Sequence, residues 1–339
     1  MKVAAAVLLD AAPGRLRVSG MKSMTKYETI LFPTDFSESA DDALKTALAV
    51  ARAFGARLHV FHAVVSETPY VVPADGVLAI PSQEGLFAEM ERHARAELSR
   101  IEGLAADGIV EVTTEARRGD GTVDSILEVA TDRGADLIVM SSHGRRGFRR
   151  LLLGSVAEEL VRRAPCPVLV IRRDPERVPV SPSGRILAAI DFSPHSEQVL
   201  STARSLAANL GRELDLIHVV HLPSASAMAV GTTPFGPVSP APPESVSYEE
   251  RTVRARELLE HTFEAVGGPQ VESRAVVRSG QPEAEIVAHA EENHASLIVV
   301  GTEGHSGVSR LLLGSVCERV LRRAPCPVFV VPHHDQEGS

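Results

Sequence analysis

The sequence predicts an α/β fold built from two tandem, doubly wound, five-stranded and mostly parallel sheets. Short apolar runs that fit buried strands alternate with longer segments of helical spacing, a pattern typical of parallel strands joined by right-handed crossovers. Residues 150–170 are identical to residues 310–330 at 16 of 21 aligned positions, so the chain contains an internal duplication. A chain of 339 residues is long enough to give each copy a full core.

The first half opens with an apolar strand at 29–34 that leads into the turn Asp35–Ser37. Ser37 is a suitable N-cap for a helix that stops at Gly55, because its hydroxyl can accept a backbone N–H of the first turn. Three prolines within 66–82 indicate a loop. The other expected strands are 57–65, 110–116, 137–140 and 168–171, and the other expected helices are 83–104, 123–133 and a helix after Gly154.

The second half repeats this order of elements. Six prolines between residues 221 and 247 predict a long loop in the place of the shorter loop of the first half. The expected strands are 185–190, 214–220, 271–277, 297–300 and 328–331, and the expected helices are 199–210, 248–266, 284–293 and 317–323.

These elements divide the chain into two domains, at 28–173 and 185–332, joined by a proline-containing linker at 174–184. Residues 1–27 have no counterpart in the second half, and we expect a disordered extension or a start site assigned too early, since Met21 and Met24 stand just before the repeat. The apolar run after Lys2 suggests a secretory signal, but Asp10 interrupts it. Residues 333–339 are expected to form a C-terminal tail.

Composition excludes several classes of protein. A formal net charge of −9 and a pI near 5.8 argue against a nucleic-acid binder, which carries a basic face. No apolar run reaches the roughly 18 residues of a membrane span. Cys166, Cys317 and Cys326 form no CxxC pair, so we expect a reducing compartment, the cytoplasm. Cys166 and Cys326 lie in matching Ala-Pro-Cys-Pro-Val segments and are expected to be buried packing residues.

The most informative motif is the glycine-rich loop of the second half. It begins with Gly301 and Gly304 after an apolar strand, and nine residues later Gly314, Ser315 and Val316 open a helix. Strand, glycine loop and helix N-terminus form the arrangement that binds phosphate, because glycines let the backbone approach closely and the free N–H groups face the anion. The first half carries the equivalent residues Ser141, Gly144, Gly154, Ser155 and Val156.

An acidic turn lies at the carboxyl end of the first strand in each half, at Asp35 and Asp191. Ligands of parallel sheets bind at the carboxyl ends of strands, where the strand order reverses. One crevice per half can therefore hold a nucleotide, with the aspartate near the sugar or base and the glycine loop on the phosphates.

Both halves resemble the ATP-binding type of universal stress protein domain, over about 28–172 and 185–332. The second half matches the Gly-x2-Gly-x9-Gly-Ser/Thr motif of that family in full, whereas the first half has Ser141 in place of the first glycine. The starts Pro33–Ser37 and Ile190–Ser193 also resemble the first strand and turn of the family. The resemblance implies a Rossmann-like fold of the adenine nucleotide alpha hydrolase type.

The same resemblance implies a set of roles for the site. ATP, together with Mg²⁺, is the expected ligand, and Asp35 and Asp191 are expected to contact the nucleoside. The segments His62-Ala63 and His218-Val219 resemble the one whose backbone meets adenine, which implies Ala63 and Val219. The short last strands are implied to pair across a pseudo-twofold axis, forming an internal pseudo-dimer. A homodimer of the tandem chain stays open, and the sequence identifies no protein partner.

Simpler structural interpretations stay open for each feature. The glycines can be turn and cap residues, and the two aspartates can be helix caps. His143 and His305 do not align with each other, which argues against a histidine pair used for catalysis in both halves. The four arginines of the first loop can be a phosphate clamp or an exposed basic face; they are Arg145, Arg146, Arg149 and Arg150.

Three functional classes follow from these patterns. The favoured class is a non-catalytic ATP-binding module for stress response or signalling, because neither half supplies a repeated base, nucleophile or acid cluster. A slow ATPase or phosphotransferase is the second, although no GxxxxGK[S/T] loop is present. A structural pseudo-dimer without ligand is the third. We expect the second site to bind ATP more tightly because Ser141 restricts backbone approach, and the arginine-rich first site to depend more on salt.

Overall fold

The computed structural model describes residues 26–65, 83–104, 108–143, 153–172, 184–220, 232–233, 236–237, 248–302 and 313–333. The elements of the first half are β1 (Thr29–Pro33), α1 (Glu38–Phe54), β2 (Arg57–Val64), α2 (Gln83–Leu104), β3 (Val112–Arg118), α3 (Thr122–Asp132), β4 (Leu137–Ser141), α4 (Ser155–Arg163) and β5 (Val168–Ile171).

The second half follows the same order. Its elements are β6 (Ile186–Ala189), α5 (Ser196–Leu210), β7 (Leu214–Val220), α6 (Tyr248–Val266), β10 (Ser273–Ser279), α7 (Pro282–Glu292), β11 (Leu297–Gly301), α8 (Ser315–Arg323) and β12 (Val328–Val331). A small antiparallel pair, β8 (Thr232–Thr233) with β9 (Gly236–Pro237), lies between β7 and α6 in the chain.

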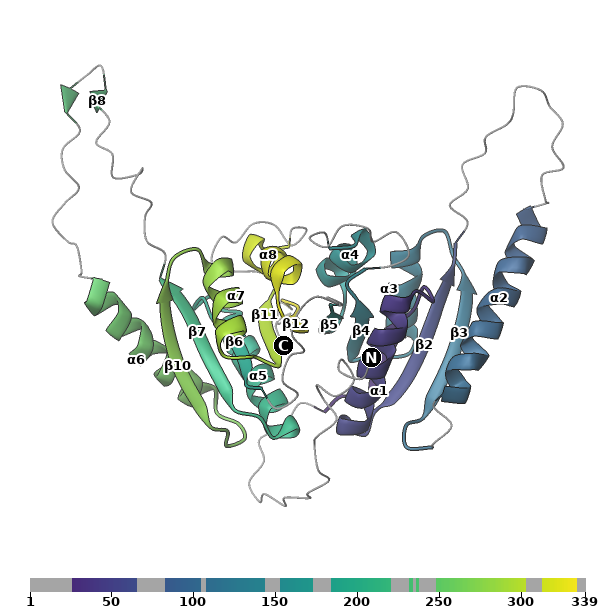
Figure 1. Cartoon of the computed structure of the whole chain (residues 1–339), viewed down its shortest axis with the longest axis horizontal. Helices are drawn as coiled ribbons and strands as arrows, with labels where there is room; N and C mark the ends of the chain where they lie inside the picture. The colour runs from purple at the N-terminus through teal and green to yellow at the C-terminus, as the bar shows by residue number, and fades with distance from the viewer. Residues whose placement is uncertain are drawn as a thin grey trace, which may run out of the picture.

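The two halves share one ten-stranded sheet, in the order β10-β7-β6-β11-β12-β5-β4-β1-β2-β3 (Figure 1). Within this sheet, the strand pairs of each half are all parallel. At the centre, β12 pairs with β5 in the antiparallel direction, with Phe329 opposite Leu169. The last strands therefore pair with each other as predicted, and neither is left as an exposed edge.

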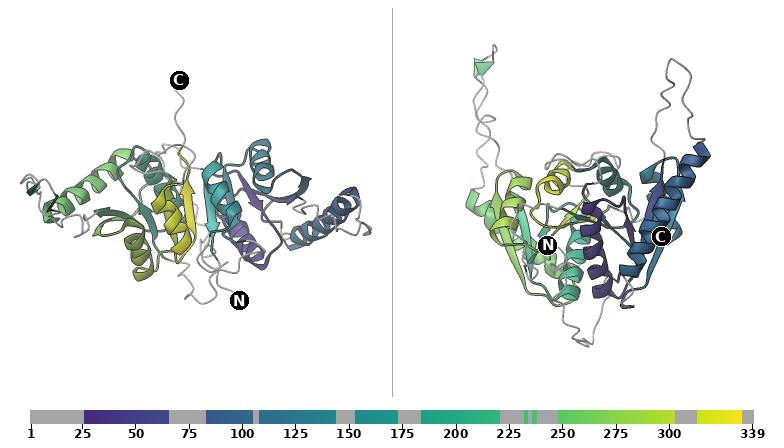
Figure 2. Two further views of the ribbon diagram at one scale, coloured as in Figure 1. Left: turned by 90° about the horizontal axis from the view of Figure 1, so that it is seen from above. Right: turned by 45° about the vertical axis from the view of Figure 1, so that its right-hand side comes forward.

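Helices cover both faces of the sheet, because successive strand residues point to opposite faces and both sets are apolar. Ile30 and Phe32 belong to one buried cluster together with residues of α1, α2, α5 and α6. Leu31, which lies between them, belongs to a second cluster with residues of α3, α4, α7 and α8. Seen from above, the yellow C-terminal elements lie beside the teal elements of the first half (Figure 2).

Helix α1 shows how local sequence sets an element. Ser37 is its N-cap, and the Ser37 hydroxyl accepts the backbone N–H of Ala40 at 3.2 Å. Gly55 ends the helix with a left-handed φ of 65°, a conformation that glycine adopts without a Cβ clash. Both ends agree with the prediction from sequence.

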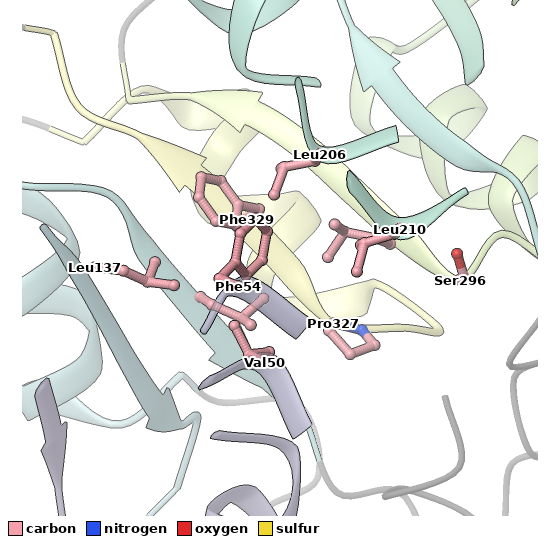
Figure 3. Close-up of a pocket in the computed structure, with 10 residues that line it drawn as sticks. Val50, Phe54, Leu137, Leu206, Leu210, Ser296, Pro327 and Phe329 are labelled. Carbon is pink, nitrogen blue, oxygen red and sulfur yellow. The ribbon is translucent and has the colours of Figure 1, made fainter. Parts of the chain in front are cut away.

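The junction of the halves is closed by apolar side chains beneath the central strands (Figure 3). Val50 and Phe54 of α1 lie opposite Leu206 and Leu210 of α5, next to Phe329 of β12. The space they leave is about 20 Å³, roughly enough for one water molecule, but a stable water needs two or more polar partners and Ser296 is the only polar side chain in this lining. This cavity is therefore a packing gap within the junction.

Several predicted boundaries were wrong. The edge strands were predicted at 110–116 and 271–277, but β3 and β10 both lie two residues later. Val110 is buried without joining the ladder, whereas polar Arg118 and Ser279 do join it, opposite Val64 and Val220. Residues 199–210, 284–293 and 317–323 were predicted as helices, but α5, α7 and α8 start two or three residues earlier. Most of the missed residues, such as Ser196, Glu283 and Ser315, are polar and add nothing to the apolar pattern. Part of the loop predicted at 221–247 forms β8 and β9.

Candidate functional site

The strand order reverses once in each half, at β1 and at β6, and a crevice forms there. β1 pairs with both β2 and β4, and β6 pairs with both β7 and β11. At these points the chain crosses over in opposite directions, so the loops after the two neighbouring strands diverge. The aspartate turns follow β1 and β6, and the glycine loops follow β4 and β11.

The aspartate turn has the same conformation in both halves. Phe36 and Phe192, next to the aspartates, have left-handed φ values of 60° and 65°. Asp191 accepts the backbone N–H of Ser193 at 3.0 Å and the hydroxyl of Ser196 at 2.8 Å. Asp35 accepts the Ser37 backbone N–H at 3.1 Å and the Ser37 hydroxyl at 2.6 Å. Each carboxylate is thereby oriented by the turn that carries it.

The two ends of each glycine loop are tied together by a backbone hydrogen bond. Gly314 donates its N–H to the Thr302 carbonyl at 2.8 Å, and Gly154 donates to the Ser142 carbonyl at 2.9 Å. Gly154 and Gly314 are the N-caps of α4 and α8, and a glycine cap has no side chain to cover the first-turn N–H groups. Gly144 and Gly304, predicted for the middle of the loops, lie outside the described residues.

The other predicted residues lie around these ends. Ser155 and Ser315 are exposed at the first position of α4 and α8. Val156 and Val316 are half-buried against the core. Ala63 and Val219 lie near the carboxyl ends of β2 and β7, next to the strands that carry the aspartates, and both pack against the same cluster.

In the second half these residues line a single cavity of about 600 Å³. Its lining includes six of the seven residues predicted for this site, which are Asp191, Val219, Gly301, Gly314, Ser315 and Val316. Known small-molecule sites occupy about 300–1,000 Å³, so the cavity is of the size that holds a nucleotide.

Several lining residues were not predicted. Pro282 and Ile286 of α7 form part of the wall, and the apolar face of α7 was the available signal for Ile286. Cys317 also lines the cavity, and burial raises the pKa of its thiol above the ordinary value, which keeps it in the unreactive thiol form. His218 belongs to the lining as well, and its repetition as His62 in the first half was a usable signal.

His195 is the most consequential of the unpredicted residues. Its ring is 4% exposed, lines the cavity, and contacts the ring of His333 edge-on at 5.0 Å between centroids. A Cβ added at Gly301 would lie 2.7 Å from His195 Nδ1, closer than real contacts allow. A larger residue at position 301 would therefore force the His195 ring to move.

The first half has a serine at each of the two equivalent positions. Ser39 lies where the second half has His195, and Ser141 lies where it has Gly301. The hydroxyls of Ser39 and Ser141 both donate to the His143 carbonyl at 2.8 Å. His143 itself exchanges a hydrogen bond with the Ser142 hydroxyl through Nδ1 at 2.8 Å, and the first-loop arginines lie outside the described residues.

The model of the universal stress protein family matches the chain twice, at residues 26–172 and 182–332. The chain belongs to the universal stress protein family. It carries two universal stress protein units in tandem, as the resemblance implied.

Relatives that match a large part of the chain are found in mycobacteria. A universal stress protein from Mycolicibacterium smegmatis is 29% identical over 328 residues, which cover 92% of this chain and 99% of that protein. Universal stress protein Rv2005c from Mycobacterium tuberculosis is 34% identical over 214 residues, 61% of this chain and 65% of the relative, so the chain spans less than two thirds of that protein.

The fold is shared with a solved universal stress protein from Archaeoglobus fulgidus. That structure superimposes with a TM-score of 0.65, covers 90% of this chain and 98% of its own, and is 24% identical in sequence. At this level of identity the comparison establishes the architecture alone.

No described helix is long and apolar enough to cross a bilayer. Within the same residues, no group of three or more His, Cys, Asp or Glu side chains is arranged to hold a metal ion.

Proposed function

We propose that this universal stress protein binds ATP and acts as a non-catalytic module of a stress response or signalling system. The observation that carries the proposal is the cavity of about 600 Å³ in the second half, at the carboxyl ends of β6 and β11. An acidic turn forms one side of this cavity, and the uncapped N-terminus of α8 forms another.

The chemistry of the lining fits the two ends of a nucleotide. Asp191 and the backbone near Val219 would recognise the nucleoside, with the apolar wall of Ile286 beside the base. Gly314 and Ser315 would face the phosphates, because backbone N–H groups at a helix N-terminus attract anions. Mg²⁺ would be held mainly by phosphate oxygens and water, the arrangement common for this ion in nucleotide sites.

The proposed role is binding rather than turnover. The features that the halves share are the aspartate turn and the loop ends, both of which position a ligand. The histidines that repeat, His62 and His218, bond to a backbone carbonyl, and His195 of the second site has Ser39 as its equivalent in the first. We place the protein in a reducing compartment, the cytoplasm, because its three cysteines are buried as thiols and none forms a disulfide.

Binding is tested by measuring nucleotide released from the denatured, purified protein and by calorimetry with ATP and Mg²⁺. Ser315→Ala should weaken the second site by roughly 1 kcal/mol, about fivefold, through loss of one hydroxyl contact. Gly304→Val should block the phosphate path of that site, and Ser155→Ala is the matched variant of the first half. An ATP affinity unchanged by both second-half substitutions would contradict the placement of the site.

Hydrolysis separates the proposed binding module from a slow ATPase. We expect the protein to retain ATP with negligible turnover, because the histidines repeated in the two sites, His62 and His218, each bond to a backbone carbonyl and so have a structural role. A rate of roughly 1 per second or faster that disappears in His143→Ala would contradict this part of the proposal.

A further inference from the structure

The aspartate turn contains a backbone conformation that needs support. Phe36 and Phe192 both have a left-handed φ, which residues other than glycine rarely adopt. Such a conformation persists only where the surroundings hold it. The same unusual residue occurs at the same place in both halves, directly after Asp35 and Asp191.

A histidine contacts this turn in the same way in each half. The ring of His62 stacks on Phe36 with centroids 4.3 Å apart and an interplanar angle of 30°. The ring of His218 lies 4.4 Å from Phe192 at 37°. Each histidine comes from the neighbouring strand, β2 or β7, so it joins the turn to the sheet.

The same histidine ring also hydrogen-bonds the backbone just before the aspartate. His62 Nδ1 lies 2.7 Å from the Thr34 carbonyl oxygen, and His218 Nδ1 lies 2.8 Å from the Ile190 carbonyl oxygen. A carbonyl oxygen only accepts hydrogen bonds, so Nδ1 must carry the proton and donate it. The hydrogen bond thus holds the residue before the aspartate, and the ring contact holds the phenylalanine after it.

The two halves keep this arrangement although their neighbouring residues differ. Ala63 in the first half is Val219 in the second, and Thr34 is Ile190. The contact therefore does not depend on one particular local packing. His218 also lines the cavity of the second half, so the contact lies at the edge of the site.

We propose that His62 and His218 are positioning residues, whose Nδ1–H groups hold the turns that aim Asp35 and Asp191 at the nucleoside. The inference rests on the proposed ATP-binding function. Without the donated hydrogen bond, the carbonyl of the residue before the aspartate loses its link to the neighbouring strand, and the carboxylate is no longer held in one orientation. Binding then weakens because the turn must be ordered when the ligand arrives.

Two double variants separate the contribution of the hydrogen bond from that of the aromatic ring. The double variant His62→Phe/His218→Phe keeps an aromatic ring but loses the donor. The double variant His62→Asn/His218→Asn keeps a donor close to the Nδ1 position but loses the ring. His261→Phe, at an exposed position on α6, is the control for the loss of a histidine elsewhere.

Calorimetry with ATP and Mg²⁺ should show about tenfold weaker binding in the phenylalanine variant, the effect of one good hydrogen bond. The asparagine variant should recover most of that loss, and the control should bind as the wild type does. Equal affinities in the phenylalanine variant and the wild type would overturn the inference. So would an asparagine variant as weak as the phenylalanine variant.

The tautomer provides a test that needs no ligand. Long-range proton–nitrogen NMR of the wild-type chain should show His62 and His218 protonated at Nδ1, and an Nε2–H tautomer at either residue would overturn the inference. A wild-type chain that binds no ATP would contradict the proposed function, and the NMR result would still decide whether the histidine–carbonyl contact exists.

Discussion

The two crevices use the same backbone with different side chains at one corner. Both have an aspartate turn, a left-handed phenylalanine and a loop whose ends are tied together. In the second half, Gly301 makes room for His195, whereas in the first half Ser141 and Ser39 both bond to the His143 carbonyl. The comparison teaches that the residue at the first glycine position of the loop motif depends on the side chain it contacts: glycine goes with His195, and serine goes with Ser39.

A second comparison concerns a buried polar position at the amino ends of the strands. Asp215 in β7 is the counterpart of His59 in β2. Asp215 is 1% exposed and accepts hydrogen bonds from Arg185 and Arg274 at 2.6 Å and from His289 at 2.8 Å. His59 instead bonds to the Thr113 hydroxyl and lies 3.3 Å from Glu115. The duplication kept a buried polar network here while exchanging its members.

The largest expected effect is on stability, from Asp215→Ala. Removing the carboxylate leaves two arginines and a buried histidine without their shared acceptor, which should cost about 3 kcal/mol. The matched change His59→Ala should cost only about 1 kcal/mol, because Glu115 keeps Arg117 and Arg133 as partners. Urea unfolding of both variants checks this order, and equal losses would contradict it.

Asp215 and His59 should lose their contributions to the stability of the fold in two separate pH ranges. Burial would raise the pKa of Asp215, but hydrogen bonds from His289, Arg274 and Arg185 outweigh it and lower this pKa to about 2 from 3.8. Its contribution to stability is therefore present above pH 3.8 and is lost as the pH falls toward 2. Burial and the charge of Arg133 lower the pKa of His59 below 6.5, so its contribution is lost as the pH falls below 6.5.

Stability measured as a function of pH checks these ranges. His59→Gln should reduce the loss of stability just below pH 6.5 and leave the loss below 3.8 intact. A His59→Gln variant with the wild-type pH dependence throughout would contradict the assignment.

The contact between Gly301 and His195 predicts a smaller loss that can be reversed. Gly301→Ser places a Cβ against the buried ring, which should destabilise the chain by about 1–3 kcal/mol and weaken ATP binding in the second half. Adding His195→Ser recreates the serine pair of the first half and should restore most of the stability. Additive effects of the two substitutions in a double-mutant cycle would show that the residues are not coupled.

The reciprocal change, Ser141→Gly in the first half, tests why the two sites should differ in their affinity for ATP. The steric argument from sequence predicts that Ser141→Gly strengthens ATP binding in the first half. The hydrogen bond from Ser141 to the His143 carbonyl gives the serine a structural role, which predicts no gain in affinity. Calorimetry on Ser141→Gly decides between the two, and the second site serves as an internal control.

The smallest expected effect comes from a matched pair of turn residues. His294 has a left-handed φ of 51°, and its counterpart Gly134 has a φ of 58°. His294→Gly should stabilise the chain by about 0.5–1 kcal/mol, since glycine adopts this conformation without strain. Gly134→Ala should destabilise it by a similar amount, and urea unfolding in which both variants match the wild type would contradict the argument.

Most of the fold could be predicted because its strands are buried on both faces and therefore apolar throughout. Strand Val168–Ile171 and helix Gln83–Leu104 were predicted to the residue. The edge strands were shifted because one side of each is polar, so that the buried Val110 resembled the start of the strand and Arg118 did not resemble its end. The spacing of apolar residues does not indicate at which residue the hydrogen bonds between two strands begin.

The site was predictable where it repeats and hidden where the halves differ. The aspartates and loop ends occur twice with fixed spacing, which singled them out. His195 lies in a polar turn and has no histidine counterpart, so only its contact with Gly301 reveals it. The wall formed by α7 depends on how a helix packs over the sheet, which residue spacing alone does not give.

The most direct test of the account is a calorimetric titration of the wild-type chain with ATP and Mg²⁺, repeated for Asp35→Ala and Asp191→Ala. The account predicts two binding steps in the wild type, with the tighter step lost in Asp191→Ala and the weaker, more salt-dependent step lost in Asp35→Ala. A wild-type chain without bound or bindable ATP would contradict the account, as would two variants that both titrate like the wild type.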